Sequence, residues 1–389
     1  MGAQGHHEII RWRVVGACAL AATVLITVGL LSLIRGPGEG DPLVVILPGS
    51  EGPSAQAFRE DFPRLEFVSE MGHDGQQVYA VARNPWHLEE AAPHLDRPTY
   101  RLGRPLLSWL GWALHPSGGG RGLAWSLITV EVLAVFGFAV AGGALVQLCG
   151  GRPWLAAAFP FLPGTMATVA ITTSDVLATG LFAGSVAAAL RRRFGLSAGL
   201  GALAILAKES VGLPLGVVFV AMAFTQARGD GCVERLRTLV CSREIAAGAA
   251  TFVPWLVWSA WIRVQLGAET RLVEFGPPFG GVLDAWQLRW SQGRDVVALV
   301  TVSLTYVLAA WAVVQARRSP RVRPLWWALI VQVLFTSTFA ASVVALDYNG
   351  TRTTLPLLVL ALAVAVGAKE HEGAWKLRRS LSRRRPTPV

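Results

Sequence analysis

The sequence predicts an all-helical membrane protein with about ten transmembrane helices. Hydrophobic residues make up 53% of the 389 residues and charged residues only 15%, and the mean hydropathy is +0.47. This composition carries more apolar surface than a soluble core of this size buries. Long apolar runs recur along the chain, and basic residues gather between alternate runs. We therefore treat residues 1–389 as a single transmembrane domain.

The apolar runs give the expected positions of the spans. A membrane-spanning helix needs roughly 20 apolar residues, and fewer where it lies inside a helical bundle. The fifth and sixth of the ten candidate runs are the shortest. The runs cover residues 14–34, 121–149, 154–171, 174–190, 195–207, 211–226, 244–263, 296–316, 324–346 and 353–368.

The basic residues predict the orientation of these spans. If both termini are cytoplasmic, alternation through ten spans places every basic cluster on the cytoplasmic side, as the positive-inside rule requires. The basic tail, residues 369–389, is then a cytoplasmic topology signal that contacts anionic membrane lipids. This arrangement accounts for the net charge of +10 without nucleic acid as a partner.

Residues 35–120 form the largest extracytoplasmic loop in this topology. The apolar stretch 104–115 is too short to span, so we expect an interfacial helix there. In "GHDGQQVYAVARNPW", residues 72–86, Asp74 shares the apolar face of a short helix with Val78 and Val81. Asp74 is either the N-cap of this helix or a carboxylate held at the membrane boundary for chemistry.

Four segments carry a resemblance to a known family: "HDGQQVYAVARNP", "LDRPTYRLGRPLL", "LAKESVGLPL" and "DYNGTRTTLPLL". Together they resemble bacterial integral membrane proteins related to the GT-C glycosyltransferases. The resemblance implies a location in the bacterial inner membrane, a sugar donor linked to polyprenyl phosphate, and a catalytic acidic residue in the first external loop. It leaves a divalent metal open, but no DxD motif accompanies Asp74, so the sequence supports no metal site and no other cofactor.

Asp74 would be the base that takes a proton from the acceptor hydroxyl. We expect a site of low dielectric at the membrane boundary to raise its proton affinity. His73 and Gln77 flank Asp74 and could position the acceptor, or each could be an ordinary solvated polar residue. Asp96 could bind the acceptor or orient Arg101, or it could form a turn before Pro98.

Four basic residues are candidates for binding the phosphate: Arg101, Arg104, Lys208 and Arg352. The predicted topology brings them to the extracytoplasmic side, and the planar guanidinium group can bind two phosphate oxygens. Arg101 and Arg104 could instead snorkel from an interfacial helix. Lys208 and the adjacent Glu209 could form a local ion pair at a helix end.

Two further acidic residues lie at membrane depth. Ser174 or Asp175 could cap the helix that starts there. Glu131, in the middle of the second span, could be hydrogen-bonded within the bundle or could line a cavity.

The leading hypothesis is a glycosyltransferase that moves a sugar from a polyprenyl-phosphate donor to a cell-envelope acceptor on the extracytoplasmic face. One alternative is a non-enzymatic carrier or flippase for a lipid-linked sugar or polysaccharide. Another is an inactive family member that acts as an assembly partner. Substitution of Asp74 by Asn separates the first two, because a carrier should retain function.

Overall fold

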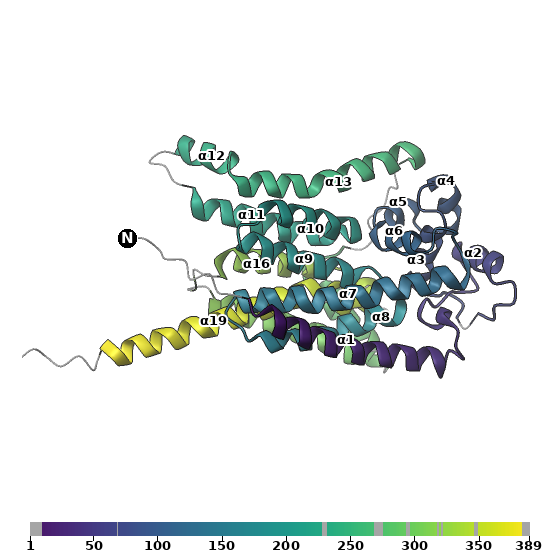
Figure 1. The fold of residues 1–389 in the computed structure, drawn as a ribbon, viewed down its shortest axis with the longest axis horizontal. Helices are drawn as coiled ribbons and strands as arrows, with labels where there is room; N and C mark the ends of the chain where they lie inside the picture. Colours follow the sequence, from purple (N-terminus) through teal and green to yellow (C-terminus); the bar gives the residue numbers. More distant parts are fainter. Residues whose placement is uncertain are drawn as a thin grey trace, which may run out of the picture.

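Helices form nearly all of the regular structure in the computed structural model (Figure 1). The structure describes residues 10–67, 69–227, 232–267, 275–292, 296–316, 319, 322–345 and 349–382. This part of the chain contains no β-strand, and its β-type pairing is limited to two isolated bridges, Gly49 with Ser69 and Phe275 with Phe339. The prediction of an all-helical fold is confirmed.

Five helices in the described residues are long and apolar enough to cross a membrane. They match the first, second, sixth, seventh and eighth predicted runs. The protein therefore has the character of a membrane protein. The five are α1 (Trp12–Arg35), α7 (Gly120–Leu148), the segment Glu209–Gln226 that contains α11 (Gly212–Gln226), α13 (Arg243–Leu266) and α15 (Val296–Ala316).

The other predicted spans are shorter or broken. The third run forms η3 (Pro153–Phe161) and α8 (Pro163–Ile171), which meet at 49° and would make a sixth span if counted together. Proline explains this break, since its ring excludes the hydrogen bond that a continuous helix needs. The fourth, fifth and tenth runs form apolar helices of 10–17 residues: α9 (Asp175–Leu190), α10 (Phe194–Ala207) and the first part of α19 (Leu355–Ser382).

The ninth predicted run is divided. Helix α16 (Arg323–Ser337) ends before the run does, and a separate short helix, α17 (Ala341–Ala345), follows it. By length and composition, the described helices thus include five or six spans, and the expectation of ten is not confirmed. At the C-terminus, α19 continues into the predicted tail as far as Ser382, and residues 383–389 lie outside the described residues.

Short helices from the predicted external loop gather at one end of the bundle, on the right of Figure 1. They pack around a small core that contains Phe58 and Tyr79, whose ring centroids are 4.6 Å apart. The stretch expected to be an interfacial helix is helical and contains α6. These helices are η1 (Pro42–Val45), α2 (Ser54–Asp61), α3 (Asp74–Arg83), α4 (Leu88–Ala91), η2 (Ala92–His94), α5 (Pro98–Leu102) and α6 (Leu106–Leu114).

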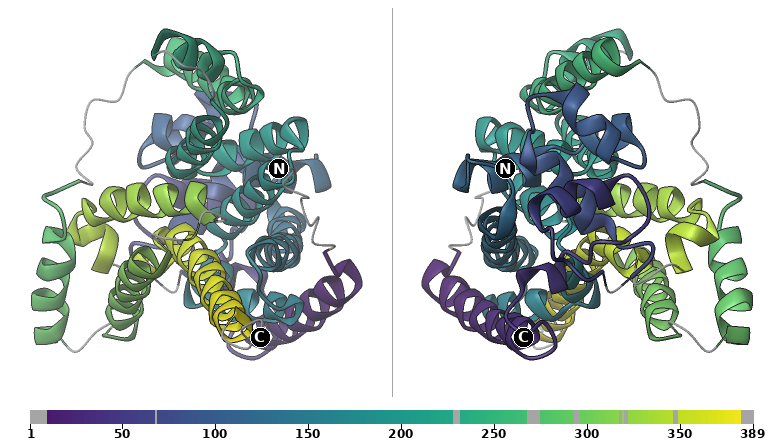
Figure 2. Two further views of the ribbon diagram at one scale, coloured as in Figure 1. Left: turned by 90° about the vertical axis from the view of Figure 1, so that its left-hand side faces the viewer. Right: turned by 90° about the vertical axis from the view of Figure 1, so that its right-hand side faces the viewer.

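The remaining helices complete the bundle. Helix α12 (Cys232–Val240) lies at the opposite end of the bundle, at the upper left of Figure 1. Figure 2 shows the bundle end on, with α1, α13 and α14 (Gly280–Gln292) at three separate corners. A short helix, α18 (Asn349–Thr353), packs against α8 and leads into α19.

Candidate functional site

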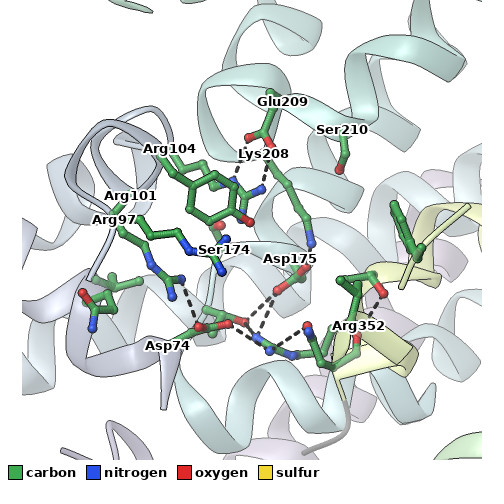
Figure 3. Close-up of a pocket in the computed structure, with 18 of the residues that line it drawn as sticks. Asp74, Arg97, Arg101, Arg104, Ser174, Asp175, Lys208, Glu209, Ser210 and Arg352 are labelled. Carbon is green, nitrogen blue, oxygen red and sulfur yellow. Dashed lines mark hydrogen bonds and ion pairs between the residues drawn. The ribbon is translucent and has the colours of Figure 1, made fainter. Parts of the chain in front are cut away.

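A charged cavity of about 300 Å³ lies where the external helices meet the ends of the membrane helices (Figure 3). Its walls come from α3, α5, α6, α9, the segment that joins α10 to α11, and the region from α16 to α18. One part of the lining is charged and another is apolar. The charged residues are Asp74, Arg97, Arg101, Arg104, Asp175, Lys208, Glu209 and Arg352, and the large apolar residues are Val78, Val81, Phe275, Phe335, Phe339 and Val343.

Asp74 lies at the floor of this cavity as the first residue of α3. The adjacent Gly75 packs so closely on α8 that a Cβ atom there would lie 2.4 Å from the backbone oxygen of Ile171. This close packing holds the start of α3 against the end of a membrane helix. Asp74 is therefore positioned by the backbone of two elements that are distant in sequence.

Two arginines hold the carboxylate of Asp74. Its Oδ1 lies 2.9 Å from Nη1 of Arg101, and its Oδ2 lies 3.0 Å from Nη2 of Arg352. The N-cap position belongs to His73, so the interpretation of Asp74 as the N-cap is wrong. The carboxylate of Asp74 lines the cavity, and its side chain is 36% exposed.

The expected rise in the proton affinity of Asp74 is also wrong for the free site. Burial alone would raise the pKa of Asp74, as expected. The charges of Arg352 and Arg101 and the hydrogen bonds that they donate outweigh burial and hold the pKa below its ordinary value. The sequence argument considered the low dielectric but not the paired cations.

Arg101 connects Asp74 to Asp96. Its Nε and Nη2 each donate to one oxygen of Asp96 at 2.8 Å, which is the bidentate geometry that arginine often forms with carboxylates. Asp96 and Arg101 thus form the contact that an orienting role requires. Burial would raise the pKa of Asp96, but the hydrogen bonds and the charge of Arg101 lower it overall. Gln77 accepts a hydrogen bond from the backbone N–H of Asp96 at 3.2 Å, which ties α3 to this segment.

Arg352 joins the two carboxylates of the cavity floor. Its side chain is only 5% exposed, and it donates to Asp74, to Asn349 at 3.0 Å and to Thr173 Oγ1 at 3.0 Å. Its Nη1 also lies 3.5 Å from Oδ2 of Asp175. Within the described part of the chain, the buried Nε of Arg352 has no hydrogen-bond partner. One arginine therefore links α3, α9 and α18, and it retains one unused donor.

Lys208 and Glu209 do not pair with each other, so the expectation of a local ion pair is wrong. Lys208 pairs with Asp175, while Glu209 accepts from Nε and Nη2 of Arg104 at 2.7 and 2.5 Å. Helix α10 ends at Ala207, so the chain is extended at Lys208 and the two successive side chains diverge. Each finds a partner on a different element.

Arg104 also contacts an aromatic ring. Its guanidinium carbon lies 4.0 Å from the centroid of the Tyr100 ring, within the range of a cation–π contact. The side chains of Arg101 and Arg104 line the cavity and pair with carboxylates. This arrangement replaces the snorkelling interpretation for both residues.

Asp175 belongs to the site, although the sequence suggested only a capping role. It starts α9, and its Oδ2 accepts from Thr173 at 2.9 Å. The turn before it contains Thr172 in the left-handed conformation, held by a hydrogen bond from its hydroxyl to the backbone oxygen of Val45. A charged residue at the start of an apolar run was the available signal, because ionisable groups at membrane depth are costly.

Two residues considered from the sequence are not part of the cavity lining. His73 is not among the residues that line the cavity. Glu131 is buried within α7, and neither of its carboxylate oxygens has a hydrogen-bond partner in the described part of the chain. Among the described residues, no group of three or more His, Cys, Asp or Glu side chains is arranged to hold a metal ion.

Comparisons of this chain with protein-family models, with curated proteins and with solved structures find no match. The case for a function therefore depends on the chemistry of the cavity.

Proposed function

We propose that this protein is a membrane glycosyltransferase that moves a sugar from a polyprenyl-phosphate donor to a cell-envelope acceptor on the extracytoplasmic face. The observation that carries the proposal is the composition of one cavity. A carboxylate, an excess of cations and an apolar wall meet there, at the ends of membrane helices. Each of the three matches one part of such a reaction.

The charges of the cavity suit an anionic substrate. Five basic and three acidic side chains line it, so basic side chains outnumber acidic ones in the lining. Four of the five basic residues are arginines, which bind phosphate oxygens in pairs. Arg101 and Arg352 are already held in place by carboxylates, so little side-chain entropy is lost when a phosphate binds.

The apolar wall suits a lipid chain. Phe275, Phe335 and Phe339 pack together with ring centroids 5.2 to 5.9 Å apart. Val78 and Val81 of α3 add to the apolar lining. A ligand with an anionic head and an apolar chain would contact both parts of the cavity at once.

The reaction assigns a role to each group. The acceptor hydroxyl attacks the anomeric carbon of the sugar, and Asp74 takes the hydroxyl proton. The bond between the anomeric carbon and the phosphate oxygen breaks, and its electron pair stays on that oxygen. Arg101 and Arg352 stabilise the negative charge that develops there. Lys208 and Arg104, fixed by Asp175 and Glu209, extend the cationic lining.

A non-enzymatic carrier for a lipid-linked sugar is the second candidate. The pairing of Asp74 with two arginines favours it, because a carboxylate with a lowered pKa is a weak base. The same cavity would then bind the head group without transferring the sugar.

Transfer of radiolabelled sugar from a panel of polyprenyl-phosphate donors to envelope extract tests the proposal. The purified protein in lipid is compared with Asp74→Asn and with Glu51→Gln, an exposed carboxylate of the same external region that does not line the cavity. A glycosyltransferase loses transfer only in Asp74→Asn. Donor binding without transfer by any of the three proteins would favour the carrier.

A further inference from the structure

We infer that Asp74 is an internal counter-ion that the anionic head of the substrate displaces from Arg101 and Arg352. The inference rests on the proposed function, because it assumes that a phosphate binds in this cavity. In the free protein, the Asp74 carboxylate stands where two phosphate oxygens would otherwise bind.

The geometry shows a site built for more than one carboxylate. Arg101 on α5 and Arg352 on α18 approach Asp74 from different elements, and each binds one of its oxygens. Arg352 is 5% exposed, and its Nε has no acceptor among the residues that the structure describes. A buried, unused donor costs free energy, and a phosphate offers more acceptor oxygens than the carboxylate does.

The groups that face Asp74 remain charged when it is displaced. Arg101 stays bound to Asp96, and Arg352 stays close to Asp175, so both cations keep their positions. Asp74 would lose two charge-assisted hydrogen bonds and would gain a negatively charged phosphate as its neighbour. Both changes favour the protonated acid.

Substrate binding is therefore coupled to proton uptake. Asp74 is a weak base while the arginines hold it, and its proton affinity rises only when the donor head has replaced it. While the pH stays above this raised pKa, Asp74 is still ionised in the loaded site and takes its proton from the acceptor hydroxyl, whereas uptake from solvent becomes complete only as pH falls below it. This coupling reconciles the low pKa of the free site with a role in catalysis.

Isothermal titration calorimetry tests the displacement. The full-length protein in nanodiscs is titrated with farnesyl methyl phosphate, a phosphodiester that keeps one negative charge between about pH 5 and pH 8. Repeating the titration in buffers of different ionisation enthalpy measures the protons taken up. We expect uptake of up to one proton by the parent and affinity that rises as pH falls, by at most about tenfold per pH unit. Asp74→Asn should bind about tenfold more tightly, without proton uptake or pH dependence, and Glu51→Gln should match the parent.

The possible results distinguish a failure of the displacement from a failure of the proposed function. Binding by the parent without proton uptake, and with the affinity of Asp74→Asn, would overturn the displacement and leave the anion site intact. No binding of the phosphodiester by any variant would overturn the anion site and the proposed function together. Proton uptake is measured on the parent itself, so the test does not depend on the folding of a variant.

A second inference concerns the opposite end of the molecule. Helix α12 presents three large apolar side chains to the outside: Val233 is 82% exposed, Leu236 58% and Val240 61%. At 100° per residue, these three lie within an arc of about 60° on one face of the helix. Arg237 flanks this face, about 40° from its edge, whereas Arg235 lies on the far side of the helix.

We propose that α12 lies in the headgroup layer of the membrane and binds anionic phospholipids. Helices α11 and α13, both candidate spans, flank it in sequence, and only residues 227–231 and 241–242 connect them to it. These short connections hold α12 at the membrane surface. An exposed apolar face flanked by arginine, here Arg237, is the pattern of an interfacial helix, in which the guanidinium group reaches lipid phosphates.

The exposed Cys241 next to α12 provides a place for a probe. An environment-sensitive fluorophore is attached there in the full-length protein with the other three cysteines replaced by serine. We expect blue-shifted emission in nanodiscs that contain phosphatidylglycerol, a smaller shift in phosphatidylcholine alone, and loss of the shift in Leu236→Asp. Emission typical of water in both lipids, unchanged by Leu236→Asp, would overturn the proposal.

Discussion

Arg352 on α18 and Asp74 on α3 form an ion pair at 3.0 Å, although 278 positions separate them in the chain. The pair joins the last part of the bundle to one of the short helices near the start of the chain. Arg352 also contacts the start of α9 through Thr173 and Asp175. The cavity is thus closed by contacts that form only when the whole chain has folded.

Loss of Arg352 should destabilise the protein as well as the site. Its side chain is buried, and Arg352→Ala leaves Asp74 with a single partner. Removing one member of a buried pair typically costs about 3–5 kcal/mol. We expect a clear fall in the thermal unfolding temperature in detergent. The control is Arg121→Ala, because Arg121 is 70% exposed and its pair with Asp41 should contribute less than about 1 kcal/mol. Equal effects of the two substitutions would contradict the role of Arg352.

The Lys208–Asp175 pair should show strong coupling. Either Lys208→Met or Asp175→Asn alone leaves a buried charge without its nearest partner. We expect the double variant to be less destabilised than the sum of the two single variants, by about 1–3 kcal/mol in a double-mutant cycle. Thermal unfolding of the four proteins measures this. Additive effects would mean that the two charges do not depend on each other.

Asp96 should act through Arg101. Asp96→Asn removes one charged acceptor from the bidentate contact and loosens the guanidinium that faces Asp74. Donor affinity should fall about tenfold, the equivalent of roughly one charge-assisted hydrogen bond. Titration with farnesyl methyl phosphate gives the affinity, with Glu51→Gln as the control. A change in turnover with unchanged affinity would contradict this positioning role.

The stability that Asp74 contributes should depend on pH in a defined direction. Its pKa is lowered in the folded protein, so its contribution is complete above the unfolded value of about 3.9 and is lost as pH falls below it. The difference in thermal stability between the parent and Asp74→Asn should therefore be constant between pH 5 and pH 7 and should shrink near pH 3–4. Unfolding scans over this range check the sign. A difference that grows as pH falls would contradict it.

The apolar wall should distinguish a lipid phosphate from a free phosphate. Phe339→Ser removes one of the three packed rings without changing the charge of the cavity. We expect weaker binding of farnesyl methyl phosphate and unchanged binding of inorganic phosphate, both measured by calorimetry. Equal losses for both ligands would show that the substitution disturbs the cationic part instead.

The sequence predicted the helical membrane character and most of the site residues for sound physical reasons. Apolar runs identified α1, α7, α13 and α15 almost to the residue, because length and hydropathy determine a span. Ionisable residues near apolar runs are costly, which drew attention to Asp74 and Lys208, and the predicted topology placed Arg352 on the same side of the membrane. All three line the cavity.

The partners of these residues could not be predicted. Arg104 and Glu209 are 105 positions apart, and no local pattern indicates that they meet. The neighbours Lys208 and Glu209 seemed a natural pair, but the end of α10 turns them apart. The predicted rise in the pKa of Asp74 was wrong for the same reason. The direction of the shift depends on two arginines that only tertiary structure brings together.

The most direct test of the central claim is a single-turnover transfer assay on protein already loaded with its donor. Donor binding is measured in parallel, so that loss of chemistry is separated from loss of affinity. If Asp74 is the base, Asp74→Asn should bind the donor yet transfer the sugar at least about 100-fold more slowly than the parent and Glu51→Gln. Transfer by Asp74→Asn at the parental rate would contradict the assignment of Asp74 as the catalytic residue.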